Sequence, residues 1–164
     1  MEEAKVKKVK RQNFGLGSIV AVPLTDGRFA FLKIYRNQAA VYDLVLDHIP
    51  DVNVVLNSKI AFFHAGPETA IRKGLWPVIG EQPFNDPDDA WPPPKATCYD
   101  WRQNRWTMWG VPHVNHKGQT FRATLEQVQG LERLTVSPNV ESFVWTIERR
   151  LIKGLNDEFK VKPP

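Results

Sequence analysis

The sequence predicts an α+β fold that is mostly β: a curved antiparallel sheet, or a partly open small barrel, with one C-terminal packing helix. In the first third of the chain, three strand-like segments follow one another with only short turns between them. A further strand-like pair follows a proline-rich stretch, and an apolar stripe with helical spacing lies near the C-terminus. The length of 164 residues suits one domain.

The first three strands are predicted to form an antiparallel meander over residues 18–24, 28–35 and 39–46. All three segments are rich in β-branched and apolar side chains, and the middle one is apolar on both faces, as a central strand would be. Asp26 and Gly27 favour the positive φ of a two-residue hairpin turn, and residues 36–38 supply the next turn.

The middle of the chain carries weaker signals. Residues 51–58 fit a short helix or a loop, 59–65 a fourth strand, and 71–80 a short extended piece. Residues 77–94 hold six of the thirteen prolines. Because proline has no N–H for a strand ladder, we expect a long irregular loop there. After a hairpin at residues 95–111, a mixture of helix and strand is expected.

The clearest single element is a helix within residues 137–157. Its apolar side chains form one continuous stripe at helical spacing: Val140, Phe143, Val144, Ile147 and Leu151. We expect Ser137 as the N-cap, Pro138 as the first helical residue and Gly154 at the end. The stripe predicts that the helix covers a sheet face, with Trp145 on its flank.

The positive charge is concentrated at the N-terminus. Residues 1–11 hold five cations and two glutamates, so they carry +3 of the net charge of +4 and leave +1 for the remainder. We therefore expect a flexible basic arm at residues 1–13 and a single domain at residues 14–160. Nucleic acid is not an expected partner, because the body of the protein has almost no basic excess.

Composition also bears on localisation. No apolar run approaches the length of a membrane span, and the N-terminus lacks the apolar core of a signal peptide. Cys98 is the single cysteine, so it cannot form an internal disulfide. We expect a cytoplasmic protein that does not enter a membrane, with Cys98 as an inert, half-buried side chain.

Two histidines are candidates for a metal site. His113 and His116 lie three residues apart in a polar stretch, where a turn could present both imidazoles to one ion. A hydrolytic zinc site would need a third ligand, for which the candidates are His48, His64, Asp43, Asp47 and Asp100. The alternative is that both imidazoles face solvent in a loop.

An aromatic cluster is the other candidate site. Its members lie within 19 residues: Trp91, Tyr99, Trp101, Trp106 and Trp109. We expect Trp101 to meet Trp106 across the hairpin turn, flanked by Arg102 and Arg105. The cluster could be core packing, a partner-binding patch or the wall of a small-molecule pocket, and Trp with Arg is typical of interface hot spots. The acidic, proline-rich loop before it could dock a basic partner or be a solvated connector.

The N-terminal part of the chain resembles the immunity protein 26 family of bacterial polymorphic toxin systems. The matching residues are Gly17, Val20, Pro23, Leu24, Asp26, Gly27, Arg28, Phe29, Tyr42 and Asp43. Trp76, Gly80 and the helix that contains Glu148–Leu151 are also similar, whereas Ser18 stands where an acidic residue is more usual. The resemblance is good over residues 14–80 and thin over residues 81–136.

The resemblance implies a mostly β protein that binds one cognate toxin domain and needs no cofactor. The same superfamily is similar to a small Pseudomonas-type phosphotriesterase that hydrolyses organophosphates such as coroxon. The sequence therefore leaves an alternative, an organophosphate triester hydrolase with an aromatic pocket. In that alternative a divalent metal such as zinc, held by His113 and His116, would activate hydroxide. No known motif allows catalytic residues to be carried over to this chain.

Overall fold

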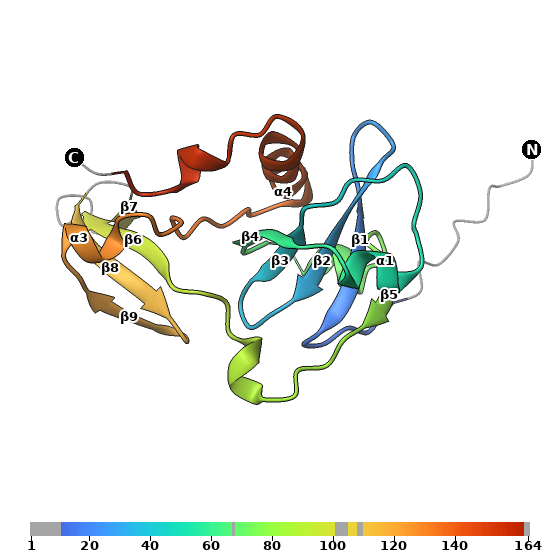
Figure 1. Ribbon diagram of the computed structural model, residues 1–164, viewed down its shortest axis with the longest axis horizontal. Coiled ribbons are helices and arrows are strands. Elements are labelled where there is room, and N and C mark those ends of the chain that lie inside the picture. Colours follow the sequence, from blue (N-terminus) through green and yellow to red (C-terminus); the bar gives the residue numbers. More distant parts are fainter. Residues whose placement is uncertain (1–10, 67, 101–104, 108–109, 163–164) are drawn as a thin grey trace, which may run out of the picture.

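The computed structural model describes residues 11–66, 68–100, 105–107 and 110–162. The strands in these residues form two antiparallel sheets that lie side by side in an elongated molecule (Figure 1). The predicted class, α+β and mostly β with a C-terminal helix, is confirmed, and neither sheet is closed into a barrel. The division into two sheets is a feature that the sequence did not indicate.

The larger sheet has the strand order β4-β3-β2-β1-β5. Its strands are β1 (Ser18–Pro23), β2 (Phe29–Ile34), β3 (Ala39–Tyr42), β4 (Ile60–His64) and β5 (Val78–Glu81). The predicted meander is confirmed, since Leu32 on β2 pairs with Val20 on one side and Val41 on the other. The first turn is one residue longer than predicted, because the Leu24 N–H donates to the Arg28 carbonyl at 2.8 Å.

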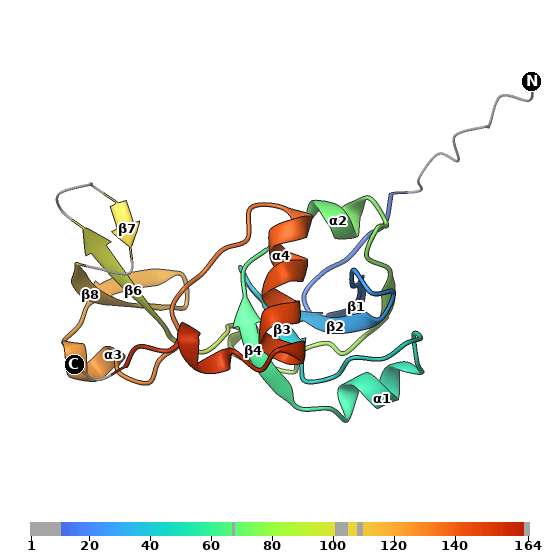
Figure 2. The same ribbon diagram turned by 90° about the horizontal axis from the view of Figure 1, so that it is seen from above.

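Helices cover both faces of this sheet. On one face, α4 (Val140–Ile147) and α2 (Thr69–Arg72) pack on side chains such as Val20 and Leu32. On the other face, α1 (Val52–Leu56) covers Ile19 and Phe31. Successive residues of a strand point to opposite faces, so the apolar run of β1 feeds both cores. Figure 2 shows α4 crossing over β3 and β4.

The smaller sheet has the order β7-β6-β8-β9. Its strands are β6 (Lys95–Asp100), β7 (Arg105–Thr107), β8 (Val111–His116) and β9 (Gln119–Arg122), and α3 (Leu125–Val128) follows them. The predicted hairpin at residues 95–111 is confirmed by the β6–β7 pairing. Described side chains of this sheet are mostly half-buried or exposed, with Lys95 and Ala96 of β6 as buried exceptions.

The C-terminal helix begins two residues later than predicted. Asn139 is the N-cap, and its side chain accepts from the Ser142 N–H at 2.9 Å. Ser137 is instead buried beside His64, so its hydroxyl serves tertiary structure rather than a helix end. After Ile147 the helix continues as a π-helical segment, η2 (Glu148–Ile152), and ends before Gly154 at φ 68°. The buried stripe and the exposed Trp145 are as predicted.

Two connections differ from the prediction, and one residue of the predicted arm contacts the body. Residues 71–80 are not one extended piece, because they begin in α2 and become a strand only at β5. The proline-rich loop is interrupted by β5 and by a 3-10 turn, η1 (Pro87–Ala90). The predicted arm includes Gln12, yet its side-chain amide donates to the carbonyls of Ile71 (3.0 Å) and Trp76 (2.9 Å). Gln12 is therefore fixed to the body, while residues 1–10 lie outside the described part, so the flexible arm stays a prediction.

Residues 131–137 connect the two sheets. Ala96 of β6 forms a parallel bridge with Arg133, and Ala65 after β4 forms another with Val136. The C-terminal segment pairs with the same stretch, since the Arg133 N–H donates to Phe159 O at 2.7 Å. Residues 131–137, which belong to neither sheet, therefore link the two sheets.

Candidate functional site

The predicted aromatic hairpin forms one edge of the smaller sheet. Arg105 and Trp106 lie on the edge strand β7, whereas Trp101, Arg102 and Trp109 lie outside the described residues. The register places Trp106 opposite Tyr99. The expected contact of Trp106 with Trp101 involves a residue outside the described part of the chain and stays a prediction.

The two candidate metal ligands lie on one strand. His113 and His116 both belong to β8, and their odd spacing sends them to opposite faces of the sheet. The Nδ1–H of His113 donates to the Val111 carbonyl at 2.9 Å. The sequence had placed both histidines in a turn, where they could converge, and the strand removes that geometry.

The other suggested ligands are also far from forming one site. His48 pairs with its neighbour Asp47 at 2.6 Å on an exposed loop, and His64 is buried. Among the described residues, no group of three or more His, Cys, Asp or Glu side chains could hold a metal ion. Their arrangement therefore gives no support to a hydrolytic centre on these histidines.

Two of the predicted site residues do meet, at a junction of three turns. The indole of Trp91 and the imidazole of His116 line one small hollow together with Arg36, Gln38 and Lys117. These residues come from the β2–β3 turn, the segment after η1 and the β8–β9 turn, which lie close together on the lower side of the molecule in Figure 1. The guanidinium carbon of Arg36 lies 5.4 Å from the centre of the Trp91 ring.

Backbone geometry fixes this three-turn junction. Asn37 and Lys117 have φ values of 64° and 51°, which are unusual for residues other than glycine and turn the chain sharply. The Arg36 N–H donates to the Ala90 carbonyl at 2.9 Å, which joins two of the turns. Trp91 packs closely on Gly118, where an added Cβ would lie 3.3 Å from the ring. The indole is thereby wedged between the two sheets.

The junction contains polar atoms without partners. Arg36 Nε and Gln38 Oε1 are both buried, and neither has a hydrogen bond within the described residues. Each such atom costs about 1–3 kcal/mol of stability relative to a satisfied one. Gln38 is only 8 % exposed as a whole residue, so water has little access to hydrogen-bond its Oε1 atom. A donor and an acceptor are therefore left unsatisfied beside the same hollow.

Two larger hollows continue from the junction. A cavity of about 360 Å³ shares Arg36 and Trp91 with the junction and adds Phe14 and Glu68. A second cavity, of about 600 Å³, shares Phe14 and Glu68 and ends at Arg72. Because adjacent hollows share lining residues, the three form one row from α2, past the β2–β3 turn, to the β8–β9 turn. We call it the basic groove, after its charged lining: Arg11, Arg36, Arg72, Lys73 and Lys117 against Glu68.

Existing contacts hold some of these charges in place. Arg72 pairs with Glu68 at 3.1 Å and lies over the Phe14 ring at 5.7 Å from its centre. Lys117 lies 3.8 Å from Asp88 of η1. These pairs are exposed to solvent and hence weak, so the side chains can exchange partners.

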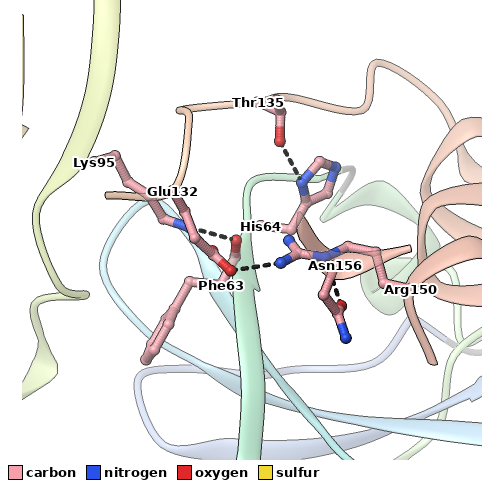
Figure 3. A network of polar contacts seen from close by, with 7 residues as sticks. All are labelled: Phe63, His64, Lys95, Glu132, Thr135, Arg150 and Asn156. Carbon is pink, nitrogen blue, oxygen red and sulfur yellow. Dashed lines mark hydrogen bonds and ion pairs between the residues drawn. The ribbon is translucent and has the colours of Figure 1, made fainter. Parts of the chain in front are cut away.

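A second polar cluster is buried between the sheets (Figure 3). Glu132 lies at its centre: Lys95 donates to one carboxylate oxygen at 2.6 Å and Arg150 to the other at 2.5 Å. Lys95 also donates to the Phe63 carbonyl at 2.8 Å. The Arg150 guanidinium carbon lies 3.8 Å from the centre of the Phe62 ring. The cluster joins β4, β6, residues 131–137 and the C-terminal helix, and we call it the Glu132 cluster.

Burial governs the pKa values in the Glu132 cluster. Burial alone would raise the pKa of Glu132, but the charges of Lys95 and Arg150 outweigh it and hold that pKa below its usual range. Burial lowers the pKa of Lys95, which Glu132 opposes. The arrangement is therefore an ionic cluster closed on itself, whose cations are 3 % and 2 % exposed and out of reach of a ligand.

His64 borders the same cluster. Its Nε2 lies 2.7 Å from the Ser137 hydroxyl and its Nδ1 2.9 Å from the Thr135 hydroxyl. Burial, and then the nearby Lys95 and Arg150 charges, lower the pKa of His64 to about 4. A hydroxyl can donate or accept, so either neutral tautomer is satisfied. His64 and Ser137 resemble a catalytic pair only in distance, because both are buried.

Sequence reasoning missed the basic groove and the Glu132 cluster. One signal was present: Arg150 follows Ile147 by three residues and so lies on the apolar stripe of the helix, where a charged residue needs a buried partner. No local pattern pointed to Lys95 and Glu132 as those partners.

The fold and the groove define a small, mostly β domain that offers an extended surface rather than an enclosed pocket. Residues 15–106 match the model of the immunity protein 26 family. The match covers more than half of the chain, so the chain belongs to this family, and an immunity-type role follows from that membership. It contains the whole larger sheet and reaches the β6–β7 hairpin. No curated protein and no solved structure gives a significant match.

Family membership implies a toxin partner in general terms, and it does not imply a cofactor. In the part of the chain that the structure describes, no helix is both long and apolar enough to cross a membrane.

Proposed function

We propose that this protein neutralises one cognate toxin domain by direct one-to-one binding in the cytoplasm. The observation that carries the proposal is the family match over residues 15–106, which contains the larger sheet and reaches into the hairpin. Two surfaces are available within the matched region. One is the predicted hairpin face, and the other is the part of the basic groove that contains Arg36 and Trp91.

The hairpin is the predicted binding face. Its residues are Trp101, Arg102, Arg105, Trp106 and Trp109, with Trp91 nearby in sequence. Trp and Arg carry much of the energy of protein interfaces because each combines a large contact area with polar groups. Among the described residues, the edge position of β7 also leaves one side of that strand without a partner strand.

The organophosphate hydrolase alternative is not proposed here. No comparison supports it, and His113 and His116 point to opposite faces of β8.

Co-expression with the toxin domain encoded beside the gene tests the proposal. We expect rescue of growth and a one-to-one complex, seen by light scattering during size-exclusion chromatography. Trp106→Ala and Arg105→Ala should each weaken binding by about tenfold or more. Trp145→Ala is the matched control, because Trp145 is exposed on α4. A parent protein that neither rescues nor binds would refute the function, whereas parent-like binding by both hairpin variants would refute only the chosen face.

A further inference from the structure

The basic groove combines two properties of a binding site, a concentration of positive charge and polar atoms without hydrogen-bond partners among the described residues. Its lining holds five cations, Arg11, Arg36, Arg72, Lys73 and Lys117, against one carboxylate, Glu68, and Asp88 lies at its edge, 3.8 Å from Lys117. The other residues have no such excess, since the whole chain carries a net charge of +4 and these five cations with Glu68 account for all of it. The concentration of cations along one continuous surface therefore marks it as complementary to negative charge.

The unsatisfied atoms indicate what kind of negative molecule fits. Arg36 Nε needs an acceptor and Gln38 Oε1 needs a donor. A peptide group offers both, as a carbonyl oxygen and an N–H, whereas a nucleic-acid backbone offers acceptors but no N–H donor. Both atoms are covered in the free groove, so the Arg36 guanidinium must first move off the Trp91 ring, with which it makes a half-buried cation–π contact at 5.4 Å.

The position of Glu68 supports the same conclusion. This carboxylate lies where the two larger hollows meet, between the cations at the Arg72 end and those at the Lys117 end. A nucleic-acid backbone carries a negative phosphate on every nucleotide, so the phosphate opposite Glu68 would be repelled by that carboxylate. A peptide can place a neutral or basic side chain opposite Glu68 and acidic side chains on either side.

We propose that the basic groove binds an extended acidic segment of a partner protein, with Arg36 at its centre. A carboxylate of the partner segment pairs with the Arg36 guanidinium, and the main chain of that segment reaches Gln38. Trp91 forms the apolar wall of the groove at this point. Acidic side chains on either side meet Arg72 and Lys117. This inference rests on the proposed function for the identity of the partner, the toxin domain, but its chemistry can be tested without one.

The test uses dye-labelled peptides and fluorescence anisotropy. The probe is a short peptide of alternating Glu and Ala, compared with its Lys and Ala counterpart and with a single-stranded oligothymidine of similar length. We expect the Glu peptide alone to bind, with affinity that falls as salt is raised. Equal binding of both peptides, no binding of the Glu peptide, or tighter binding of the oligonucleotide would each overturn the proposal.

Charge-reversal variants locate the site. Arg36→Glu and Lys117→Glu should each weaken binding of the Glu peptide by about tenfold. Lys153→Glu is the matched control, because Lys153 is exposed at the end of η2 and outside the groove. Arg36→Gln serves if Arg36→Glu does not fold, and it should also weaken binding. Parent-like affinity in the Arg36 and Lys117 variants would overturn the proposal.

The toxin domain separates the inference from the function. If the parent protein binds the toxin domain and Arg36→Glu binds it equally well, the groove is refuted while the function stands. If the parent fails to bind the toxin domain, the function is refuted, and the peptide measurements still decide whether the groove takes acidic segments.

Discussion

Replacing Glu132 by glutamine removes the charge at the centre of the Glu132 cluster and leaves its two cations buried. Lys95 and Arg150 are 3 % and 2 % exposed, and their side chains keep only neutral acceptors such as the Phe63 carbonyl and the Asn156 amide. A buried charge that loses its partner typically costs about 3–5 kcal/mol. At about 2–4 °C per kcal/mol for a domain of this size, the midpoint of thermal unfolding should fall by about 6–20 °C.

The assay is unfolding by heat and by urea, followed by circular dichroism, on the parent and two variants. Glu158→Gln is the control, since it also removes a carboxylate from an arginine, Arg149, at 2.8 Å, but on the surface. An exposed pair of that kind contributes about 0–1 kcal/mol. A Glu132→Gln protein whose free energy of unfolding falls no further than that of Glu158→Gln would refute the claim that the cluster is shielded from solvent.

Two further predictions concern the core. Gly66→Ala should destabilise the protein by about 1–3 kcal/mol or more, because an added Cβ would lie 1.9 Å from Cδ2 of the buried Phe143. Gly15→Ala is the control: nothing lies within 4 Å of its added Cβ, so it should change the midpoint of urea unfolding little. Equal midpoints for Gly66→Ala and Gly15→Ala would contradict the close packing of Gly66 on Phe143. His64 has its pKa lowered to about 4 from 6.5, so it contributes stability that is complete above about pH 6.5 and is lost as the pH falls toward 4. Between about pH 7 and pH 4.5, urea unfolding should show the parent losing about 2–3 kcal/mol more than His64→Gln, and parallel losses would show that His64 is not buried as described.

The sequence was most informative where structure is local. The meander of β1, β2 and β3 follows from runs of β-branched and apolar residues and from turn residues that tolerate positive φ, such as Gly27 at 85°. The apolar stripe predicted the packing face of α4, because a 3.6-residue period is visible in one stretch of chain. Even the error at Ser137 was small, since Asn139 is an equally good cap two residues on.

The sequence was least informative where distant segments meet. The basic groove depends on Arg36, Trp91 and Lys117, which come from three turns separated by long stretches of chain. Nothing local in a turn shows which other turn it will face. The metal site predicted on His113 and His116 lacks support for a related reason. Two side chains three residues apart can converge in a turn, which their polar setting favoured, but they point to opposite faces of a strand.

The pairing of residues 131–137 with both sheets has a consequence for synthesis of the protein. The strands of both sheets leave the ribosome before residues 159–161, which complete the pairing around Leu131 and Arg133. Lys95 and Glu132 likewise emerge before Arg150, so the nascent chain carries an incomplete ion cluster until then. We expect the larger sheet to fold while translation continues and the union of the two sheets to form only after residue 161 is made.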